Sequence, residues 1–229
     1  TYLDDPVLEQ DKNEIKTTLY LLTNIANNHH RNPYFFEKIE QILLRIKDKI
    51  TNNLSNIEIF EIFKNSKRLL LFLIKEKFVE FDEICYKRVG NNDHLKSQFQ
   101  YYFYPEIKEL IDDETREQVK SFAQEISDDN FGLFENKRKL GENDTKICQI
   151  IRDDLIDEFI QITEQDKMTL NETIEPSKFE TNPLLIENKP TLIEYSAFYG
   201  SLKIFNYLSE KVELKPTLWI YSIHSQKDE

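Results

Sequence analysis

The sequence predicts an all-α protein, built as an α-solenoid of helical hairpins, and three features of the chain support this. First, apolar residues recur at intervals of three and four over most of the 229 residues, which is the spacing of one helix face. Second, the helical stretches are short and are joined by short polar segments, which makes consecutive helices antiparallel neighbours. Third, the alternating pattern of β-strands is sparse, whereas a compact enzyme of this size usually has strand runs between its helices.

The first two predicted helices form a hairpin. Asp5-Pro6 supplies an N-cap and a proline at the first helical position, ahead of an apolar stripe over residues 15–26. Asn32-Pro33 repeats this start signal ahead of a second stripe over residues 35–50. The link between the stripes, residues 27–31, is short and polar, so we expect two antiparallel helices.

Further helices follow from capping boxes and apolar runs. Ser55-Asn56-Ile57-Glu58 fits a capping box, and Thr115-Arg116-Glu117-Gln118 fits a second one ahead of a helix over residues 119–126. The apolar run over residues 69–74 predicts a buried helix. Because a membrane-spanning helix needs about 20 apolar residues, this run excludes a membrane as partner.

Between residues 127 and 143 the helical period fails, and this break divides the chain. We expect a helical N-terminal region over residues 1–130, a linker over 131–144 and a C-terminal region over 145–229. Lys137-Arg138-Lys139 lies in this linker, where we interpret it as part of a solvated loop, because three-residue basic runs are common by chance.

The strongest signal in the chain is an internal repeat. Lys189–Phe198 recurs as Lys215–His224, with Lys, Pro, Thr, Leu, Tyr and Ser in register at an offset of 26 residues (215 − 189). Each unit opens with proline and a threonine N-cap, and Glu194 completes a capping box in the first. Gly200 ends the helix where a left-handed residue is required, and residues 202–208 form a returning apolar stripe. Such a helix-turn-helix layer is stable only when it is stacked on similar layers.

The first unit resembles an ankyrin repeat. Residues 191–200 follow the pattern T-P-L-H-x-A-A-x-x-G, with Leu192, Glu194 and Ser196 in place of proline, histidine and the first alanine. The segment 150–162 looks like a preceding, degenerate layer. Together these segments are similar to an uncharacterised ankyrin-type family expanded in parasitic protists such as trichomonads. The resemblance implies ankyrin-like repeats over 145–190 (degenerate), 191–216 and 217–229 (truncated).

The resemblance also implies a concave face that binds a partner. Tyrosines suit such a face because they offer large contact area at little cost in rotamer entropy. The alternative is that these side chains pack against residues 166–190, a segment whose three prolines exclude a long helix and predict a long loop with a short hairpin. By residue-by-residue transfer the partner-binding positions are Tyr195, Phe198, Tyr199, Tyr221, His224 and Ser225.

Charge and composition limit the possible partners. The chain has 42 acidic and 30 basic residues and a net charge of −12, with acids interleaved among the basic residues. This favours a basic protein partner and excludes nucleic acid. Four isolated glycines exclude glycine-rich nucleotide loops, so no cofactor is expected. Cys85 and Cys148 form no paired framework and predict two buried thiols in a reducing, cytoplasmic compartment.

These observations predict a non-enzymatic scaffold that binds another protein through an ankyrin-like face. Because the chain begins at Thr1 and ends within a repeat, we expect it to be part of a longer protein. Two alternatives remain: a helical enzyme or small-ligand binder with a site near the aromatic run 99–105, and an assembly domain that uses the ends of the solenoid. The four histidines show no metal-ligand spacing, so no metal or catalytic site is expected at any of them: His29, His30, His94 and His224.

Overall fold

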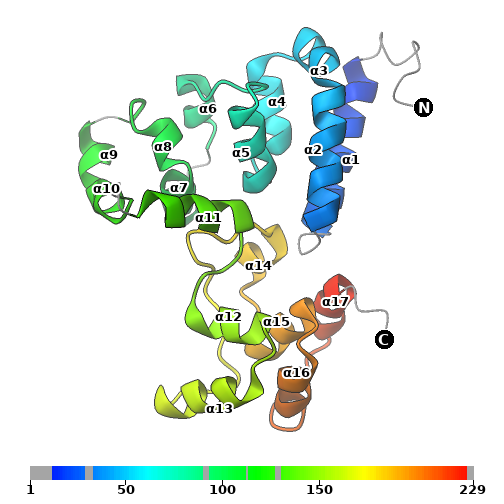
Figure 1. Cartoon of the computed structure of the whole chain (residues 1–229), viewed down its shortest axis with the longest axis vertical. Helices are drawn as coiled ribbons and strands as arrows, with labels where there is room; N and C mark the ends of the chain where they lie inside the picture. The colour runs from blue at the N-terminus through cyan, green and yellow to red at the C-terminus, as the bar shows by residue number, and fades with distance from the viewer. Residues whose placement is uncertain (1–11, 29–32, 90–92, 112, 127–129, 226–229) are drawn as a thin grey trace. The chain divides into compact units, whose positions relative to one another are not determined.

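The computed structural model describes residues 12–28, 33–89, 93–111, 113–126 and 130–225, and the regular secondary structure of these residues is helical (Figure 1). They contain no β-strand, and their one β-bridge is an isolated antiparallel pair between Thr173 and Thr191. This confirms the all-α prediction. The chain divides into two compact units, Thr1–Gly141 and Glu142–Glu229.

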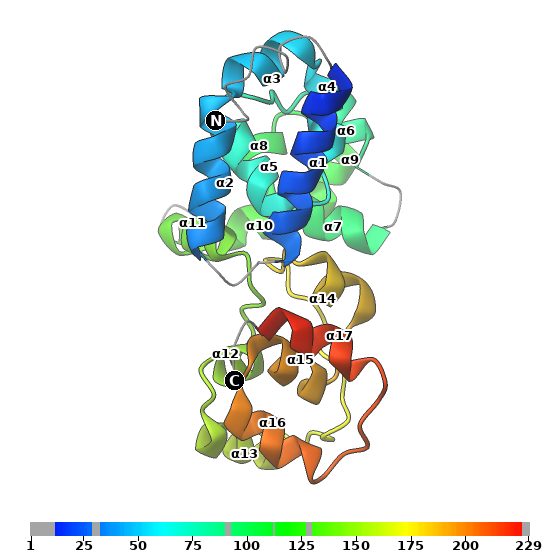
Figure 2. The same ribbon diagram turned by 90° about the vertical axis from the view of Figure 1, so that its right-hand side faces the viewer.

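The first unit contains eleven helices within its described residues. They are α1 (Lys12–Asn28), α2 (Pro33–Arg45), α3 (Lys47–Asn53), α4 (Asn56–Phe63), α5 (Lys67–Lys75), α6 (Glu83–Lys87), α7 (Asp93–Tyr102), α8 (Tyr104–Ile107), α9 (Asp113–Gln118), α10 (Lys120–Glu125) and α11 (Phe131–Leu140). Helix α1 packs against α2 and α4 (Figure 2). The predicted start signals at Asp5-Pro6 and Asn32, and residues 29–31 of the predicted link, lie outside the described residues.

The two capping boxes predicted in this unit have different outcomes. At the start of α4, Ser55 N and Ser55 Oγ both donate to Glu58 Oε2 at 3.0 Å, so this box is confirmed. The box at Thr115 is wrong, because α9 begins at Asp113 and places Thr115 inside the helix.

The apolar and aromatic runs form the core of this unit. Leu69, Leu70 and Leu73 of α5 are fully buried, as predicted. The aromatic run also contributes to this core. The rings of Phe99 and Phe103 lie 4.4 Å apart, and both contact the ring of Phe81. None of the helices in the described part of the chain has the length and apolar content needed to cross a membrane.

Residues 131–144 were expected to be a linker, but Phe131–Leu140 form α11. This helix ends at Gly141, whose φ of 67° is the left-handed conformation that glycine adopts without strain. The two compact units divide immediately after it.

The second unit is built from two helical hairpins in register. They are α12 (Lys146–Arg152) with α13 (Ile156–Gln165), and α15 (Leu192–Tyr199) with α16 (Leu202–Ser209). Thr145 precedes α12 as Thr191 precedes α15, an offset of 46 residues (191 − 145). At the same offset, Asp154 and Gly200 both adopt the left-handed conformation between the paired helices, with φ of 53° and 61°.

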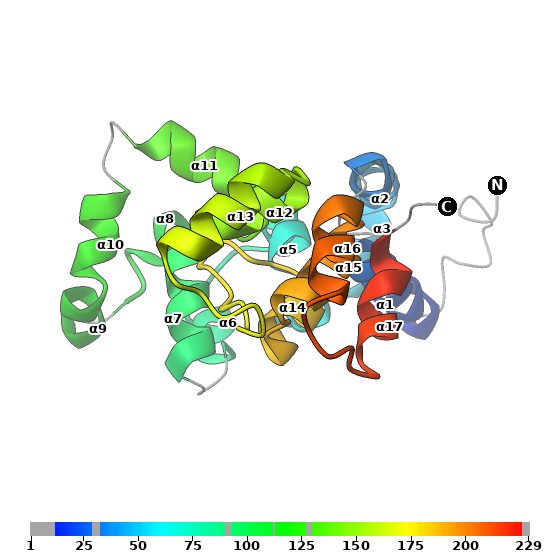
Figure 3. The same cartoon turned by 90° about the horizontal axis from the view of Figure 1, so that it is seen from below.

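These hairpins stack with corresponding helices together. Helix α12 contacts α15, and α13 contacts α16 (Figure 3). Helix α17 (Leu218–Ser222) and the 3₁₀ helix η3 (Ile223–Ser225) then pack against α15. The long segment before α15 contains one short helix, α14 (Pro183–Asn188), and pairs with the chain ahead of α15 where Ile174 N donates to Pro190 O at 2.7 Å.

Thr191 and Thr217 open the two repeats, and they play different roles. Thr191 and Glu194 form the predicted capping box, in which Thr191 N donates to Glu194 Oε2 at 2.8 Å. Ile220 occupies the position of Glu194 in the next unit, so α17 has no such box. Instead Thr217 Oγ1 donates to Glu194 Oε1 at 2.5 Å. Glu194, the capping acid of α15, therefore accepts hydrogen bonds from the opening threonines of both repeats.

Candidate functional site

Most of the predicted partner-binding residues lie in the core of the second unit. Tyr195, Phe198, Tyr199 and Tyr221 are exposed by only 0%, 1%, 1% and 4%. A partner cannot contact these rings at the surface, so the prediction is wrong for all four. His224 and Ser225 are half-buried in η3, and the ring of His224 stacks on that of Phe198 with centroids 5.1 Å apart.

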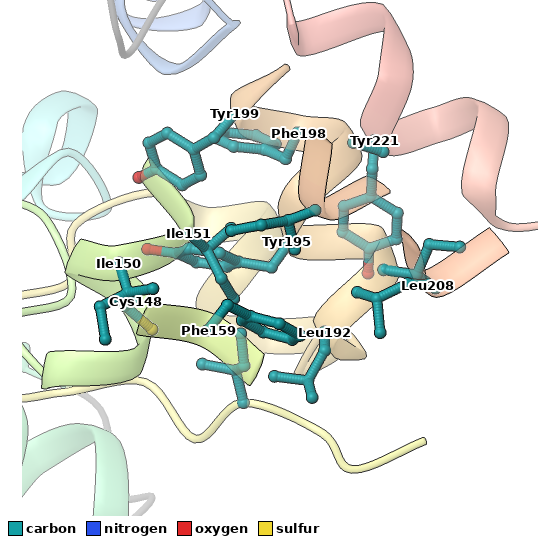
Figure 4. Packing of buried hydrophobic residues seen from close by; sticks show 14 of the residues in the cluster. Cys148, Ile150, Ile151, Phe159, Leu192, Tyr195, Phe198, Tyr199, Leu208 and Tyr221 are labelled. Carbon is teal, nitrogen blue, oxygen red and sulfur yellow. The ribbon is translucent and has the colours of Figure 1, made fainter. Parts of the chain in front are cut away.

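Contacts from neighbouring elements explain this burial (Figure 4). Tyr195 extends from α15 toward α12, where Arg152 Nη1 donates to its hydroxyl oxygen at 2.9 Å. The guanidinium of Arg152 also lies 5.7 Å from the ring centre of Tyr199. Tyr221 points from α17 toward Leu208 of α16. These rings are therefore part of the core of the second unit, which also contains Ile174 and Leu185 of the segment 166–190 against which they were alternatively expected to pack.

A buried carboxylate organises the segment before α14. Glu180 is 1% exposed and accepts hydrogen bonds from Thr181 N and Asn182 N at 2.9 and 2.8 Å, and from Asn143 N at 3.2 Å. Burial raises the pKa of Glu180 to about 7, against the hydrogen bonds from the two following amides, which lower it. Glu180 thereby joins the start of the second unit to the long segment ahead of α15.

A second buried charge lies in the first unit. Arg138 of α11 is fully buried, and its Nη1 and Nη2 donate to Glu106 at 3.0 and 2.7 Å. Tyr102 donates its hydroxyl to the carbonyl oxygen of Arg138 at 2.7 Å. The interpretation of residues 137–139 as a solvated loop is therefore wrong for Arg138, because α11 turns this side chain toward an acid and an aromatic ring while Lys139 stays exposed.

Neither cysteine has the properties of a nucleophile. Cys85 and Cys148 are both buried and form no disulfide, as predicted. Burial raises the pKa of the Cys85 thiol to about 12 and that of Cys148 to about 11, so both remain protonated near neutral pH. Within the described residues, no three His, Cys, Asp or Glu side chains are grouped so that they could hold a metal ion. His29 and His30 lie outside those residues.

An exposed apolar surface occurs where α17 has no further neighbour among the described residues. Trp219 and Ile223 are 63% and 66% exposed, whereas the residues 26 positions earlier, Ile193 and Ala197, are 4% and 6% exposed. Helix α17 and η3 pack against α15, but no described helix packs in the same way against α17. We call the exposed residues Trp219 and Ile223 the end face.

A small hollow of about 130 Å³ adjoins the end face. Its walls come from Leu202 and Phe205 of α16 and from Ser222 and Ser225 at the end of α17 and in η3. Ala197 and other small residues of α15 line it as well. This volume is close to that of one large apolar side chain. No pattern in the sequence indicates this surface, because the exposure of Trp219 and Ile223 depends on which repeat has a neighbour.

The first unit has a larger hollow, of about 510 Å³, near the aromatic run. It is lined by apolar side chains, among them Val79 and Phe81, and by the acids Glu80 and Glu106. Phe81 contacts Phe99 and Phe103, while Glu106 also binds Arg138.

Comparison of the chain with protein-family models, with curated proteins and with solved structures gives no match. The conclusions about function therefore depend on the geometry described above.

Proposed function

We propose that this chain is a non-enzymatic, cytoplasmic scaffold whose second unit is a short solenoid of ankyrin-like hairpins, and that it binds another protein at the end face. The observation that carries the proposal is the contrast between Trp219 and Ile223, which are exposed, and their buried equivalents Ile193 and Ala197. Residues at these positions are buried in the first repeat and exposed in the second. An uncovered repeat surface of this kind gains free energy when a partner covers it.

The charge of the chain supports a basic partner. The net charge is −12, which accelerates association with a positively charged protein and makes that association sensitive to salt. The two buried thiols support a reducing compartment. The proposed binding surface is thus the apolar end face, and not the concave face of tyrosines that the sequence predicted.

Site-specific photocrosslinking tests the proposal. A photoreactive benzoylphenylalanine replaces Trp219 in the full chain, and the control carries it at Glu210, an exposed residue just after α16. We expect position 219 to capture a discrete protein partner in the cells of origin and position 210 to capture none. Identical capture patterns at both positions, or no capture from either, would contradict the proposal.

The hollow in the first unit supports a second candidate function, the binding of a small apolar ligand. Its lining combines apolar side chains with Lys77, Glu80 and Glu106, and Glu106 is already paired with Arg138, so the lining suits an apolar molecule of low net charge. Val79→Trp would fill this hollow and remove such binding without changing the end face. Crosslinking at position 219 would be unaffected by that substitution.

A further inference from the structure

The hollow in the first unit is bounded by the end of α5, the segment that follows it, and α8. Its volume is about 510 Å³, and pockets that bind small molecules commonly measure about 300–1,000 Å³. The residues that line it are all described ones: Ile74, Lys77, Val79, Glu80, Phe81 and Glu106. The hollow is therefore a feature of the interior of the first unit.

The segment over residues 77–81, which provides most of the lining, is held in place at two points. The side-chain amide of Asn56 pairs with both backbone groups of Glu80, because Glu80 N donates to Asn56 Oδ1 at 2.8 Å and Asn56 Nδ2 donates to Glu80 O at 2.7 Å. The ring of Phe81 contacts the rings of Phe60 and Phe103 in the core. These contacts fix the backbone of the lining.

The part of the lining formed by Glu106 is fixed by an ion pair. Arg138, which is fully buried, donates to both carboxylate oxygens of Glu106 at 3.0 and 2.7 Å. Arg138 Nε also lies 3.3 Å from Glu135 Oε1, and Glu135 pairs with Lys75 of α5 at 2.6 Å. Because each part of the lining is held by contacts of its own, the hollow is preformed, and little ordering is needed when a ligand binds.

The charges of the lining favour an uncharged ligand. Lys77 and Glu80 are exposed and have opposite charges, while the charge of Glu106 is compensated by Arg138. Each oxygen of a carboxylate has two lone pairs, so the oxygens of Glu106 can accept further hydrogen bonds beside those from Arg138. The side chain of Glu106 is only 17% exposed, and a hydrogen bond to it is partly shielded from water.

We propose that this hollow binds an uncharged apolar molecule that carries a hydroxyl group, an alcohol or a phenol, and that the hydroxyl donates a hydrogen bond to Glu106. This inference rests on the second candidate function, the binding of a small apolar ligand, and specifies the class of that ligand. The apolar part of the molecule covers Ile74, Val79 and Phe81, and the burial of apolar surface provides most of the binding free energy.

Equilibrium dialysis of the full chain with three matched naphthalene probes at neutral pH tests this. β-Naphthol has a hydroxyl donor, its methyl ether keeps the ring and the oxygen but has no donor, and β-naphthoate is an anion. We expect β-naphthol to bind saturably with a Kd on the order of 100 μM, and the other two to bind about tenfold more weakly. Because the methyl ether is the most apolar of the three, nonspecific adsorption would favour it instead.

Matched variants of the full chain locate the binding site. Ile74→Trp brings a larger side chain into the lining from a half-buried position, and we expect it to weaken the binding of β-naphthol by about fivefold or more. Leu44→Trp introduces the same ring at an exposed position of α2 outside the lining, and should change the Kd less than about twofold. If Ile74→Trp does not fold, Glu80→Trp, at an exposed position of the lining, takes its place with the same expected result. Equal effects at the lining and at Leu44 would place the ligand elsewhere and overturn the inference.

The remaining outcomes separate this inference from the function on which it rests. If β-naphthol and its methyl ether bind equally and Ile74→Trp weakens both, the hollow binds apolar ligands, but Glu106 does not select a hydroxyl group and the inference is wrong. If none of the probes binds, the second candidate function fails as well. Binding of the β-naphthylmethylammonium cation more tightly than β-naphthol would overturn the inference in favour of a cationic ligand.

Discussion

Arg138 is a charged residue whose full side chain lies in the interior, and its partner Glu106 is bound through two hydrogen bonds. Arg138→Met would leave the half-buried carboxylate of Glu106 without them. We expect a loss of about 3 kcal/mol in the free energy of unfolding of the first unit, measured by urea denaturation. Lys139→Met, at the adjacent exposed position, is the control and should change stability by less than about 0.5 kcal/mol. Equal effects from the two substitutions would show that the ion pair does not stabilise the fold.

Glu180 makes the stability of the second unit depend on pH. Its pKa is raised to about 7 by burial, from an ordinary value of 4.5, so folding favours the protonated form. The stabilisation is fully present below about pH 4.5 and is lost as the pH rises through about 7. It amounts to about 3 kcal/mol, because each pKa unit corresponds to about 1.4 kcal/mol.

The prediction is tested by urea denaturation between pH 4.5 and pH 8. Glu180→Gln should remove this part of the pH dependence, since glutamine does not ionise. Glu175→Gln changes an exposed carboxylate five residues away and should retain it. If Glu180→Gln leaves the pH profile unchanged, folding does not raise the pKa of this carboxylate.

Residue-level chemistry was the least predictable part of the molecule. Arg138 belongs to a basic run with no apolar period around it, so nothing local indicates that Glu106, far away in the sequence, would pair with it. The tyrosines of α15 were placed outward by analogy with other repeats. Arg152 bonds to Tyr195 and lies against the ring of Tyr199 instead, and such tertiary contacts are not encoded by a repeat pattern.

Asp154 links one helical hairpin to the next. Its carboxylate accepts hydrogen bonds from Lys203 N and Ile204 N at 3.1 and 3.0 Å, which satisfies two amide groups at the start of α16. Its backbone also has a φ of 53°, which asparagine and glycine tolerate and alanine does not. We expect Asp154→Ala to destabilise the second unit by about 2 kcal/mol in thermal or urea unfolding.

Two other substitutions at this position separate the cap from the backbone conformation. Asp154→Gly loses the cap but keeps the conformation, and should cost about 1 kcal/mol. Asp154→Asn keeps both a side-chain acceptor and the left-handed conformation, and should cost least. If glycine were as stable as aspartate, the carboxylate would contribute nothing to the join between hairpins.

Helix starts and stops were predicted best where a local signal is complete. The boxes at Ser55 and Thr191 and the stop at Gly200 each depend on a few consecutive residues, and all three occur in the structure. The start of α17 differs because Ile220 replaces the capping acid, and Thr217 turns to Glu194 of the preceding unit. The repeat in the sequence thus predicted that α17 would form, but it did not predict the hydrogen bond from Thr217 to Glu194 of α15.

The whole molecule consists of two compact units, and the apolar core of the second is formed by its own residues. Residues from α12, α13, α15, α16 and α17 build one buried cluster together with Ile174 and Leu185 of the intervening segment. The exposed end face also belongs to this unit. Stacked repeats are stabilised by contacts between neighbours, and here the two full hairpins, α17 and the intervening segment share one core.

We therefore expect residues 142–229 to fold without the rest of the chain. The isolated segment should show a helical circular dichroism spectrum and a cooperative thermal transition that coincides with one transition of the full chain. Tyr195→Ala removes a fully buried ring that contacts Arg152 and should destabilise this transition by about 3 kcal/mol in both contexts. Lys203→Ala, at an exposed position of α16, should leave it unchanged.

A segment that is unfolded alone, while the full chain unfolds in a single transition, would show that the second unit depends on the first for its stability. The end face would then have to be studied only in the intact chain.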